Sequence, residues 1–335
     1  MTARREAISG LLGSRALKAK RAIVKRVRPR YRVATSRLRV LPGFVILGAQ
    51  RAGTTSVFDY LERHPDIVGP AGWDPSVPWR KELHFFTDRF DRGPDWYRAS
   101  FPLLAEQRVA RLRGGDIVAG EATPYYLFHP AVPERMAATI PDVRLIVLLR
   151  NPVERAYSHY QHSRRLNVEP LSFAEALKAE DERLSGEEER LVSDPGYSSQ
   201  AHRHFSYLSR GRYADQLERW LAYFPRERIL ILRSEDLFAE PARCYAELLG
   251  FLGVRGWAPT EFAVRNRASY APIDPALRAR LEDHFAEPNT RLTQLLGDGF
   301  AWGSPLSPGQ GTSRSASAEP YGQPAGPSVP THTRS

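Results

Sequence analysis

The chain has little cysteine and no long apolar run: among its 335 residues, Cys244 is the single cysteine. One cysteine excludes an internal disulfide and a cysteine-rich metal site, and with no cluster of metal-ligand spacing we expect no bound metal. No stretch approaches the roughly 20 apolar residues that span a bilayer as a helix. The N-terminus also lacks the apolar segment of a secretory signal, so we expect none. Cys244 lies in a helical apolar pattern with Tyr245 and Leu248, which indicates a core residue.

Acidic residues are scarce at one end of the chain. Residues 1–40 hold ten arginines and three lysines against Glu6 alone, a net charge of +12, although the whole chain carries only +10. The body is therefore close to neutral and shows no basic stripe, which argues against nucleic acid as a partner. A basic arm of this kind is a candidate for peripheral contact with an anionic membrane. A solvated leader is the open alternative.

Large apolar residues are almost missing from residues 303–335, which are rich in Ser, Pro and Gly and are expected to be disordered. One globular domain of about 41–302 remains. Apolar runs predict strands, among them 144–149, which suits a strand buried on both faces. The predicted strands are 43–48, 117–119, 144–149 and 228–232. The predicted helices are 54–64, 131–139, 152–165, 172–183, 211–223, 241–252, 275–285 and 289–296. This alternation predicts a single-domain, P-loop-like α/β fold, with a parallel sheet and helices on both faces.

The first strand is followed by a loop with two glycines, a cation and three hydroxyls before a helix starts. Backbone N–H groups at such a place bind phosphate. The loop nearly matches the nucleotide motif G-x-x-x-x-G-K-[ST], but Thr54 stands where that motif has the lysine that serves the β- and γ-phosphates. The cation here is Arg51. We expect a donor without a γ-phosphate, and an ordinary glycine turn is the alternative. The candidate donor-binding residues are Gln50, Arg51, Ala52, Gly53, Thr54, Thr55 and Ser56.

A second polar segment follows the strand 144–149. Asn151 fits a helix N-cap and Pro152 the first helical position. Arg150 thus stands at the carboxyl end of a strand, where ligands of parallel α/β folds bind, and Ser158 lies about two helical turns further on. The pair can grip a second phosphate. In the alternative interpretation, Arg150 pairs with a structural carboxylate.

A third segment, residues 80–86, places a carboxylate, two cations and an imidazole beside two phenylalanines. Glu82 is a candidate general base if partial burial raises its pKa. His84 competes for that role, since the ordinary pKa of histidine is already near neutrality. A surface charge cluster on a strand is the alternative for this segment alone.

Together these segments resemble the sulfotransferases that use 3′-phosphoadenosine 5′-phosphosulfate (PAPS), in particular the heparan sulfate N- and 3-O-sulfotransferase domains. The resemblance covers about residues 42–302. GAQRAGTTS is similar to the family's 5′-phosphosulfate loop, LLRNPVERAYSHYQH to its 3′-phosphate strand and helix, and KELHFF to the stretch with its catalytic glutamate. In the family a basic loop closes over the donor, and Arg265 and Arg267 are the matching residues. The order and spacing of the segments are shared as well.

Two departures from the family pattern stand out. The family usually has lysine where this chain has Arg51, which keeps the charge but presents it on a planar fork. Relatives often carry lysine in a Glu-Lys-[Ser/Thr]-Pro segment near the acceptor. The corresponding residues here are Glu121, Ala122, Thr123 and Pro124, so that cation is missing. Its absence weakens the expectation of a heparan-type acceptor.

The resemblance implies transfer of a sulfuryl group from PAPS to a hydroxyl or amine of a glycan, a glycolipid or a small molecule. Glu82 would act as the general base and Arg51 would stabilise the leaving phosphate. Two alternatives remain at this point, a P-loop nucleotide kinase or NTPase and a non-catalytic nucleotide-binding relative. The segment 184–210 is expected to form a lid over the acceptor. Since PAPS is a cytosolic metabolite in bacteria, a cytoplasmic enzyme is expected, with contact at the inner membrane face as an option.

Overall fold

A single parallel sheet organises the chain, and its strands confirm the predicted α/β class. The computed structural model describes residues 29–72, 81–264 and 270–302. The sheet has the order β2-β3-β1-β4-β5, and every pairing in it is parallel. Its strands are β1 (Phe44–Gly48), β2 (Ile67–Val68), β3 (Val118–Ala122), β4 (Arg144–Leu149) and β5 (Ile229–Arg233).

The central strand β1 is buried along its whole length, as its unbroken apolar sequence predicts. Phe44 stands level with Gly120 of β3 on one side and with Arg144 of β4 on the other. A Cβ atom at Gly120 would come within 2.3 Å of the Phe44 ring, so a glycine is required in β3 for the two strands to pair. This register brings the carboxyl ends of β1, β3 and β4 to one edge of the sheet.

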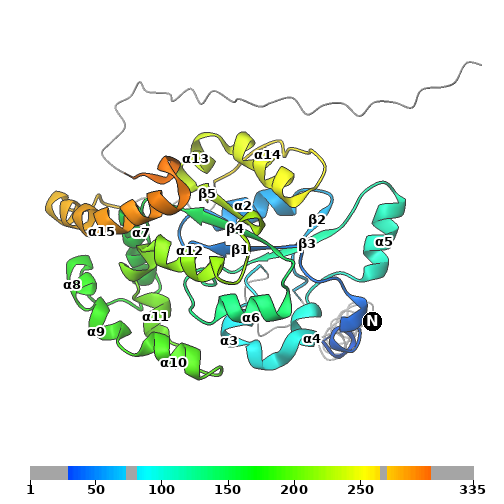
Figure 1. Cartoon of the computed structure of the whole chain (residues 1–335), viewed down its shortest axis with the longest axis horizontal. Helices are drawn as coiled ribbons and strands as arrows, with labels where there is room; N and C mark the ends of the chain where they lie inside the picture. Colours follow the sequence, from blue (N-terminus) through cyan, green and yellow to red (C-terminus); the bar gives the residue numbers. More distant parts are fainter. Residues whose placement is uncertain (1–28, 73–80, 265–269, 303–335) are drawn as a thin grey trace, which may run out of the picture. The chain divides into compact units, whose positions relative to one another are not determined.

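Helices cover both faces of the sheet. Figure 1 shows α2, α13 and α14 on one side of the strands and α6 and α12 on the other. The helices are α2 (Thr54–Glu62), α3 (Phe85–Asp88), α4 (Gly93–Arg98), α5 (Leu104–Leu112), α6 (Val132–Thr139), α7 (Pro152–Arg165), α8 (Phe173–Lys178), α9 (Glu180–Leu184), α10 (Glu187–Ser193), α11 (Gln200–His204), α12 (Tyr213–Leu221), α13 (Ser234–Ala239), α14 (Pro241–Leu252) and α15 (Pro275–Leu296). Within the described ranges, no helix combines the length and apolarity needed to cross a membrane.

Three predicted elements differ from the structure. The strand predicted at 117–119 runs to Ala122, because the carboxylate of Glu121 has buried partners and the strand tolerates it. The helix predicted at 172–183 is two short helices, α8 and α9, which meet at Ala179. The two helices predicted at the C-terminal end are one helix, α15, which continues through Pro288.

A proline inside a helix removes a backbone hydrogen bond and costs ~3 kcal/mol or more, so α15 must be stabilised in another way. Its buried residues are Leu281, Phe285, Pro288 and Leu292. They recur at helical spacing and form one unbroken stripe, of which Pro288 is a member. Packing of this stripe overrides the local preference for a break.

Candidate active site

The loop between β1 and α2 has the geometry of an anion-binding site. Gly53 takes the N-cap position of α2 with φ of 94°, a left-handed conformation that suits glycine, and as a glycine it has no side chain to cap the helix. Arg51 also has a positive φ, of 71°. The first N–H groups of α2 therefore point out of the helix at the carboxyl edge of the sheet, with the positive end of the helix dipole behind them.

Two arginines hold this loop in place. Arg210 is fully buried and donates a hydrogen bond to Oε1 of Gln50. Burial lowers the pKa of Arg210 to about 9, so it remains a cation at neutral pH. Arg150 Nη1 donates to the backbone oxygen of Arg51 over 3.0 Å, and its own backbone oxygen accepts from Tyr213 at 2.8 Å. The loop is thus rigidly positioned from both sides.

The predicted second segment joins the same site. Asn151 caps α7 by accepting hydrogen bonds from the N–H groups of Val153 and Glu154, and Pro152 occupies the first turn, as the sequence predicted. Ser158 is buried on α7 and its Oγ accepts from Arg51 Nε at 3.1 Å. The structure therefore brings Arg51, Arg150 and Ser158 together, with Ser158 bonded to Arg51.

The alternative role of Arg150, as the partner of a structural carboxylate, finds little support. Its Nη2 lies 4.0 Å from Oε2 of Glu154, at the outer limit of an ion pair. Arg278 approaches the other oxygen of Glu154 to 2.5 Å and is its closer partner. The charge of Arg150 therefore remains available at the carboxyl end of β4.

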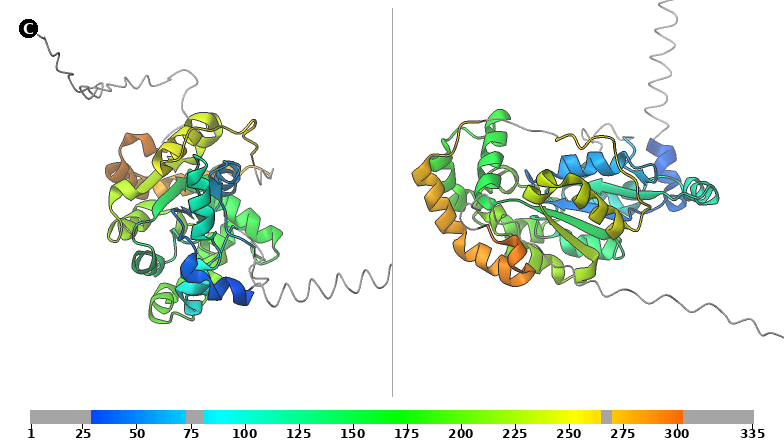
Figure 2. Two further views of the ribbon diagram at one scale, coloured as in Figure 1. Left: turned by 90° about the vertical axis from the view of Figure 1, so that its right-hand side faces the viewer. Right: turned by 90° about the horizontal axis from the view of Figure 1, so that it is seen from above.

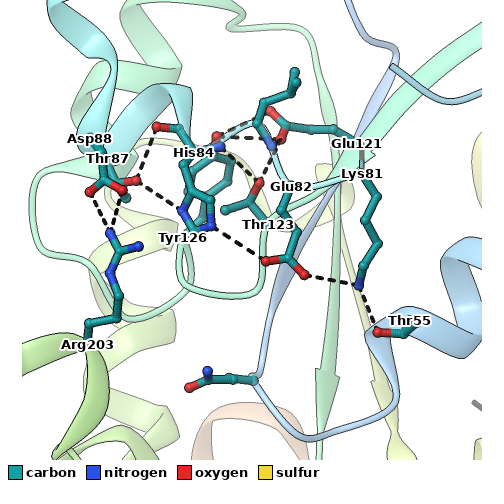
Figure 3. A network of polar contacts seen from close by, with 12 residues as sticks. Thr55, Lys81, Glu82, His84, Thr87, Asp88, Glu121, Thr123, Tyr126 and Arg203 are labelled. Atoms are coloured by element: carbon teal, nitrogen blue, oxygen red, sulfur yellow. Dashed lines mark hydrogen bonds and ion pairs between the residues drawn. The ribbon is translucent and has the colours of Figure 1, made fainter. Parts of the chain in front are cut away.

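Glu82 lies beside the phosphate loop, joined to it by Lys81. Lys81 Nζ donates to Oγ1 of Thr55 over 2.7 Å and lies 3.2 Å from Oε1 of Glu82. On the other side, His84 Nε2 is 3.5 Å from Oε2 of Glu82. Figure 3 shows this chain of contacts running from Thr55 through Lys81 and Glu82 to His84. Since Thr55 belongs to the first turn of α2, the carboxylate and the anion-binding loop form one site.

The expected direction of the Glu82 pKa is wrong. Burial acts to raise it, as the sequence analysis supposed, but the hydrogen bond from His84 and the charge of Lys81 outweigh burial. The pKa of Glu82 therefore lies below its ordinary value, and the side chain is a carboxylate at neutral pH. An ionised carboxylate can accept a proton, so the role of a base stays open to it.

His84 lies in direct contact with Glu82, and its competing role as the base stays a prediction. The residue adopts φ of 50°, and its Nδ1 lies 3.4 Å from Oγ1 of Thr87. The hydroxyl of Thr87 donates to the backbone oxygen of His84 at 3.2 Å, and the imidazole forms a hydrogen bond with Glu82. The imidazole then fixes the orientation of the carboxylate.

A second carboxylate, Glu121, lies behind the segment that carries Glu82, and the sequence analysis did not assign it a role. It is fully buried at the end of β3 and accepts from Tyr97 OH and Thr123 Oγ1, each at 2.8 Å. It also accepts from the N–H of Leu83 at 3.3 Å. Burial raises the pKa of Glu121 to about 7, against these hydrogen bonds. Glu121 thus tethers the backbone next to Glu82 to the sheet.

Replacing Glu121 by glutamine is expected to remove a pH dependence of stability. Because its pKa rises from 4.5 to about 7 on folding, the folded state holds this proton more tightly than the unfolded chain. Protonated Glu121 therefore adds ~3 kcal/mol to the free energy of unfolding below its unfolded pKa. This stabilisation is lost as the pH rises through the folded pKa. Urea unfolding at about pH 5 and about pH 8 measures it. An unchanged difference between the two pH values in Glu121→Gln would contradict this assignment.

The segment 184–210 folds into short helices, and two of its arginines contact residues next to the site. Arg203 of α11 forms an ion pair of 2.5 Å with Asp88, at the end of the helix that starts after His84. Arg210, just beyond α11, is the residue that anchors Gln50. The segment is therefore attached both to the Glu82 side and to the phosphate loop. Its role as a lid stays a prediction.

Three further expectations concern a basic loop, a metal site and Cys244. Arg265 and Arg267, the candidates for a basic loop over the donor, lie outside the described residues. Within the described ranges, no three His, Cys, Asp or Glu side chains are grouped to hold a metal ion. Cys244 is buried, as predicted.

An anion-binding loop and an ionised carboxylate at the carboxyl edge of a parallel sheet form a site of the P-loop-like class. The family model for the sulfotransferase domain matches residues 41–261. The chain therefore belongs to the sulfotransferase family and is a transferase of sulfuryl groups, which confirms the resemblance inferred from its motifs. Family membership also disfavours the kinase or NTPase alternative.

Similar proteins support this assignment. The chain is 28% identical to the membrane-associated sulfotransferase kil1 of Dictyostelium discoideum, with 79% of this chain and 67% of that protein covered. It is also 28% identical to human heparan sulfate glucosamine 3-O-sulfotransferase 6, over 79% of this chain and 75% of the relative. It matches 30% of the length of the human bifunctional heparan sulfate N-deacetylase/N-sulfotransferase 3, at 29% identity. The crystal structure of a sulfotransferase from Alicyclobacillus acidocaldarius has 32% identity and a TM-score of 0.56, covering 76% of this chain and 96% of its own.

Proposed function

We propose that the donor is PAPS and that Glu82 accepts the proton of the acceptor. The observation that carries the proposal is Lys81, which contacts Thr55 of the phosphate loop and Glu82 at once. A donor bound on the loop would place its transferable group next to the carboxylate. The anion-binding start of α2 fits the 5′-phosphate, and the site has no lysine at position 54 for a γ-phosphate.

Five side chains would take part in the reaction. An acceptor oxygen or nitrogen forms a new bond to sulfur while the bond between sulfur and the bridging phosphate oxygen breaks. The acceptor's proton passes to the Glu82 carboxylate, and adenosine 3′,5′-bisphosphate leaves. Arg51 and Lys81 stabilise the charge that grows on the departing phosphate. Arg150 and Ser158 bind the 3′-phosphate and set the register of the donor.

The acceptor is proposed to be a hydroxyl or amine of a glycan, a glycolipid or a small molecule. Two relatives carry names that refer to heparan sulfate, and this motivates a carbohydrate acceptor. Position 122, where relatives carry a lysine, is a fully buried alanine here. This site therefore offers Lys81 as the cation beside the base. We further propose that the enzyme acts in the cytoplasm, where PAPS is made in bacteria.

Transfer of label from radiolabelled PAPS tests the proposal. The protein is incubated with the donor and a panel of glycans, glycolipids and small phenols or alcohols, and the labelled products are separated. Release of adenosine 3′,5′-bisphosphate together with a labelled acceptor supports the function. The proposal would be contradicted if no acceptor became labelled from PAPS while the protein transferred a phosphoryl group from ATP with Mg²⁺.

Arg150→Ala is expected to weaken binding of adenosine 3′,5′-bisphosphate by about 10- to 100-fold. A charged hydrogen bond to phosphate contributes ~1.5–3 kcal/mol, which corresponds to that range. Isothermal titration calorimetry measures the affinity directly. Arg243→Ala is the matched control, since Arg243 is exposed on α14 and pairs with Glu240. Equal affinities of the Arg150 variant and the wild type would reject the assigned role.

A further inference from the structure

Exposed apolar side chains concentrate on one part of the molecule. Of the thirteen large apolar residues that the described chain exposes, seven lie in residues 31–41 and 104–112. Leu112 is 88% exposed and Leu38 is 61% exposed. The seven residues are Tyr31, Val33, Leu38, Leu41, Leu104, Val109 and Leu112. Single exposed apolar residues are ordinary, but a concentration of them marks an interaction surface.

The two segments are joined next to the start of α5 and are turned to the same side of the molecule, which we call the basic apolar face (residues 30–41 and α5). The N–H of Val40 donates to the oxygen of Pro102 over 3.0 Å, and Arg39 forms an isolated bridge with Leu103. In the left view of Figure 2, α5 and the blue segment before β1 both lie on the side turned to the viewer. Two segments about 60 residues apart in sequence therefore lie on one side of the fold.

Helix α5 is amphipathic and lies at the surface. None of its residues is buried. Gln107 Nε2 donates to the oxygen of Ile117 at 2.8 Å, and this contact attaches one side of the helix to the rest of the chain. At about 100° per residue, Val109 and Leu112 fall on the side opposite Gln107, and Leu104 lies between the two sides. Its apolar stripe thus faces outward.

The charge of this face is almost wholly positive. Arg30, Arg37, Arg108 and Arg113 are exposed on or beside it. The only acidic residue in 30–41 and α5 is Glu106, and its carboxylate accepts from the N–H of Leu103 at 2.6 Å. In sequence the face directly follows residues 1–28, which carry nine basic residues against one acidic residue. Apolar side chains interleaved with arginines complement a lipid bilayer, which offers apolar acyl chains beneath anionic headgroups.

We propose that the basic apolar face docks the enzyme onto an anionic phospholipid bilayer. Leu104, Val109 and Leu112 insert among the acyl chains near the headgroups, and the arginines bind lipid phosphates. Both segments lead into the amino ends of strands, 41 into β1 and α5 into β3, whereas Glu82 and the phosphate loop lie at the carboxyl ends. The active site therefore stays open to solvent while the face is bound. This inference is independent of the proposed donor.

Co-sedimentation with vesicles tests the inference. The full-length protein is mixed with vesicles of phosphatidylcholine plus phosphatidylglycerol, or of phosphatidylcholine alone, and the bound fraction is measured. We expect binding to the anionic vesicles only, weakened by added salt. The double variant Val109→Glu with Leu112→Glu should lose at least about tenfold in affinity for these vesicles, since two inserted apolar groups are lost. Val192→Glu is the matched control, because Val192 is 58% exposed on α10, and it should bind like the wild type.

Three results would overturn the inference. The wild type could ignore anionic vesicles, or the double variant could bind them as well as the wild type does. Light scattering after size exclusion could also show a wild-type dimer that the double variant breaks, which would make the face a contact between two copies. Circular dichroism melting of the double variant controls for folding. Label transfer from PAPS in the absence of vesicles separates loss of docking from loss of the proposed activity.

Discussion

Glu82→Gln is expected to lower kcat by about 10²–10⁴-fold while leaving the affinity for adenosine 3′,5′-bisphosphate nearly unchanged. Glutamine keeps the shape of the side chain, and its amide oxygen can still face Lys81 Nζ, which lies 3.2 Å from the carboxylate in the wild type. It cannot take up the acceptor's proton. Rates of label transfer and calorimetric titration with the bisphosphate measure the two quantities separately.

His84→Gln is the informative companion to this variant. If His84 only orients Glu82 across their 3.5 Å contact, its loss should cost less than the loss of the Glu82 carboxylate. The free enzyme's pH profile for kcat/KM should then lose its acid limb in Glu82→Gln and keep it in His84→Gln. Full activity of Glu82→Gln with an inactive His84→Gln would assign the base to the histidine.

Arg51→Met should lower kcat by roughly 10²–10³-fold, the usual cost of removing one preorganised group that stabilises charge in a transition state. Arg51 is the cation within the phosphate loop, and Ser158 holds its Nε at 3.1 Å. Methionine fills similar space without charge. Arg51→Lys is the matched variant, and because lysine restores the charge we expect it to recover most of the lost rate. Single-turnover label transfer separates this effect from product release.

The neighbouring cation Lys81 provides the contrasting case. Lys81→Met removes the contacts to Thr55 and Glu82 together, so it should also raise the pKa of Glu82, which this charge helps to hold down. The acid limb of the pH profile would then shift upward. An unaltered kcat in Arg51→Met, with a large loss in Lys81→Met, would transfer the charge-stabilising role from the loop arginine to Lys81.

The parts of the site that the sequence predicted are those set by local rules. A buried strand, a glycine with positive φ and a helix start define the loop around Gly53, and each is encoded within a few residues. The Asn151 cap and Pro152 are equally local. Shared motifs in one order then placed Glu82 beside that loop. Such features do not depend on how distant segments pack.

The parts that the sequence missed depend on tertiary packing. The predicted strand 117–119 ended before Glu121, whereas β3 runs on through it to Ala122. Only the fold shows that Tyr97 and Thr123 satisfy the Glu121 carboxylate. The two predicted C-terminal helices left Pro288 between them, and only its place in a buried stripe explains why α15 continues through it. The contact of Arg210 with Gln50, which links residues 160 apart in sequence, had no local signal at all.

Calorimetric titration of the wild-type protein with adenosine 3′,5′-bisphosphate, and in parallel with ATP and Mg²⁺, distinguishes a PAPS site from a nucleoside triphosphate site. We expect clear binding of the bisphosphate in the absence of metal, weakened in Arg150→Ala, and far weaker binding of ATP. Binding of ATP with Mg²⁺ alone, with no heat from the bisphosphate, would show that the loop and the Arg150–Ser158 region do not form the donor site described for this sulfotransferase.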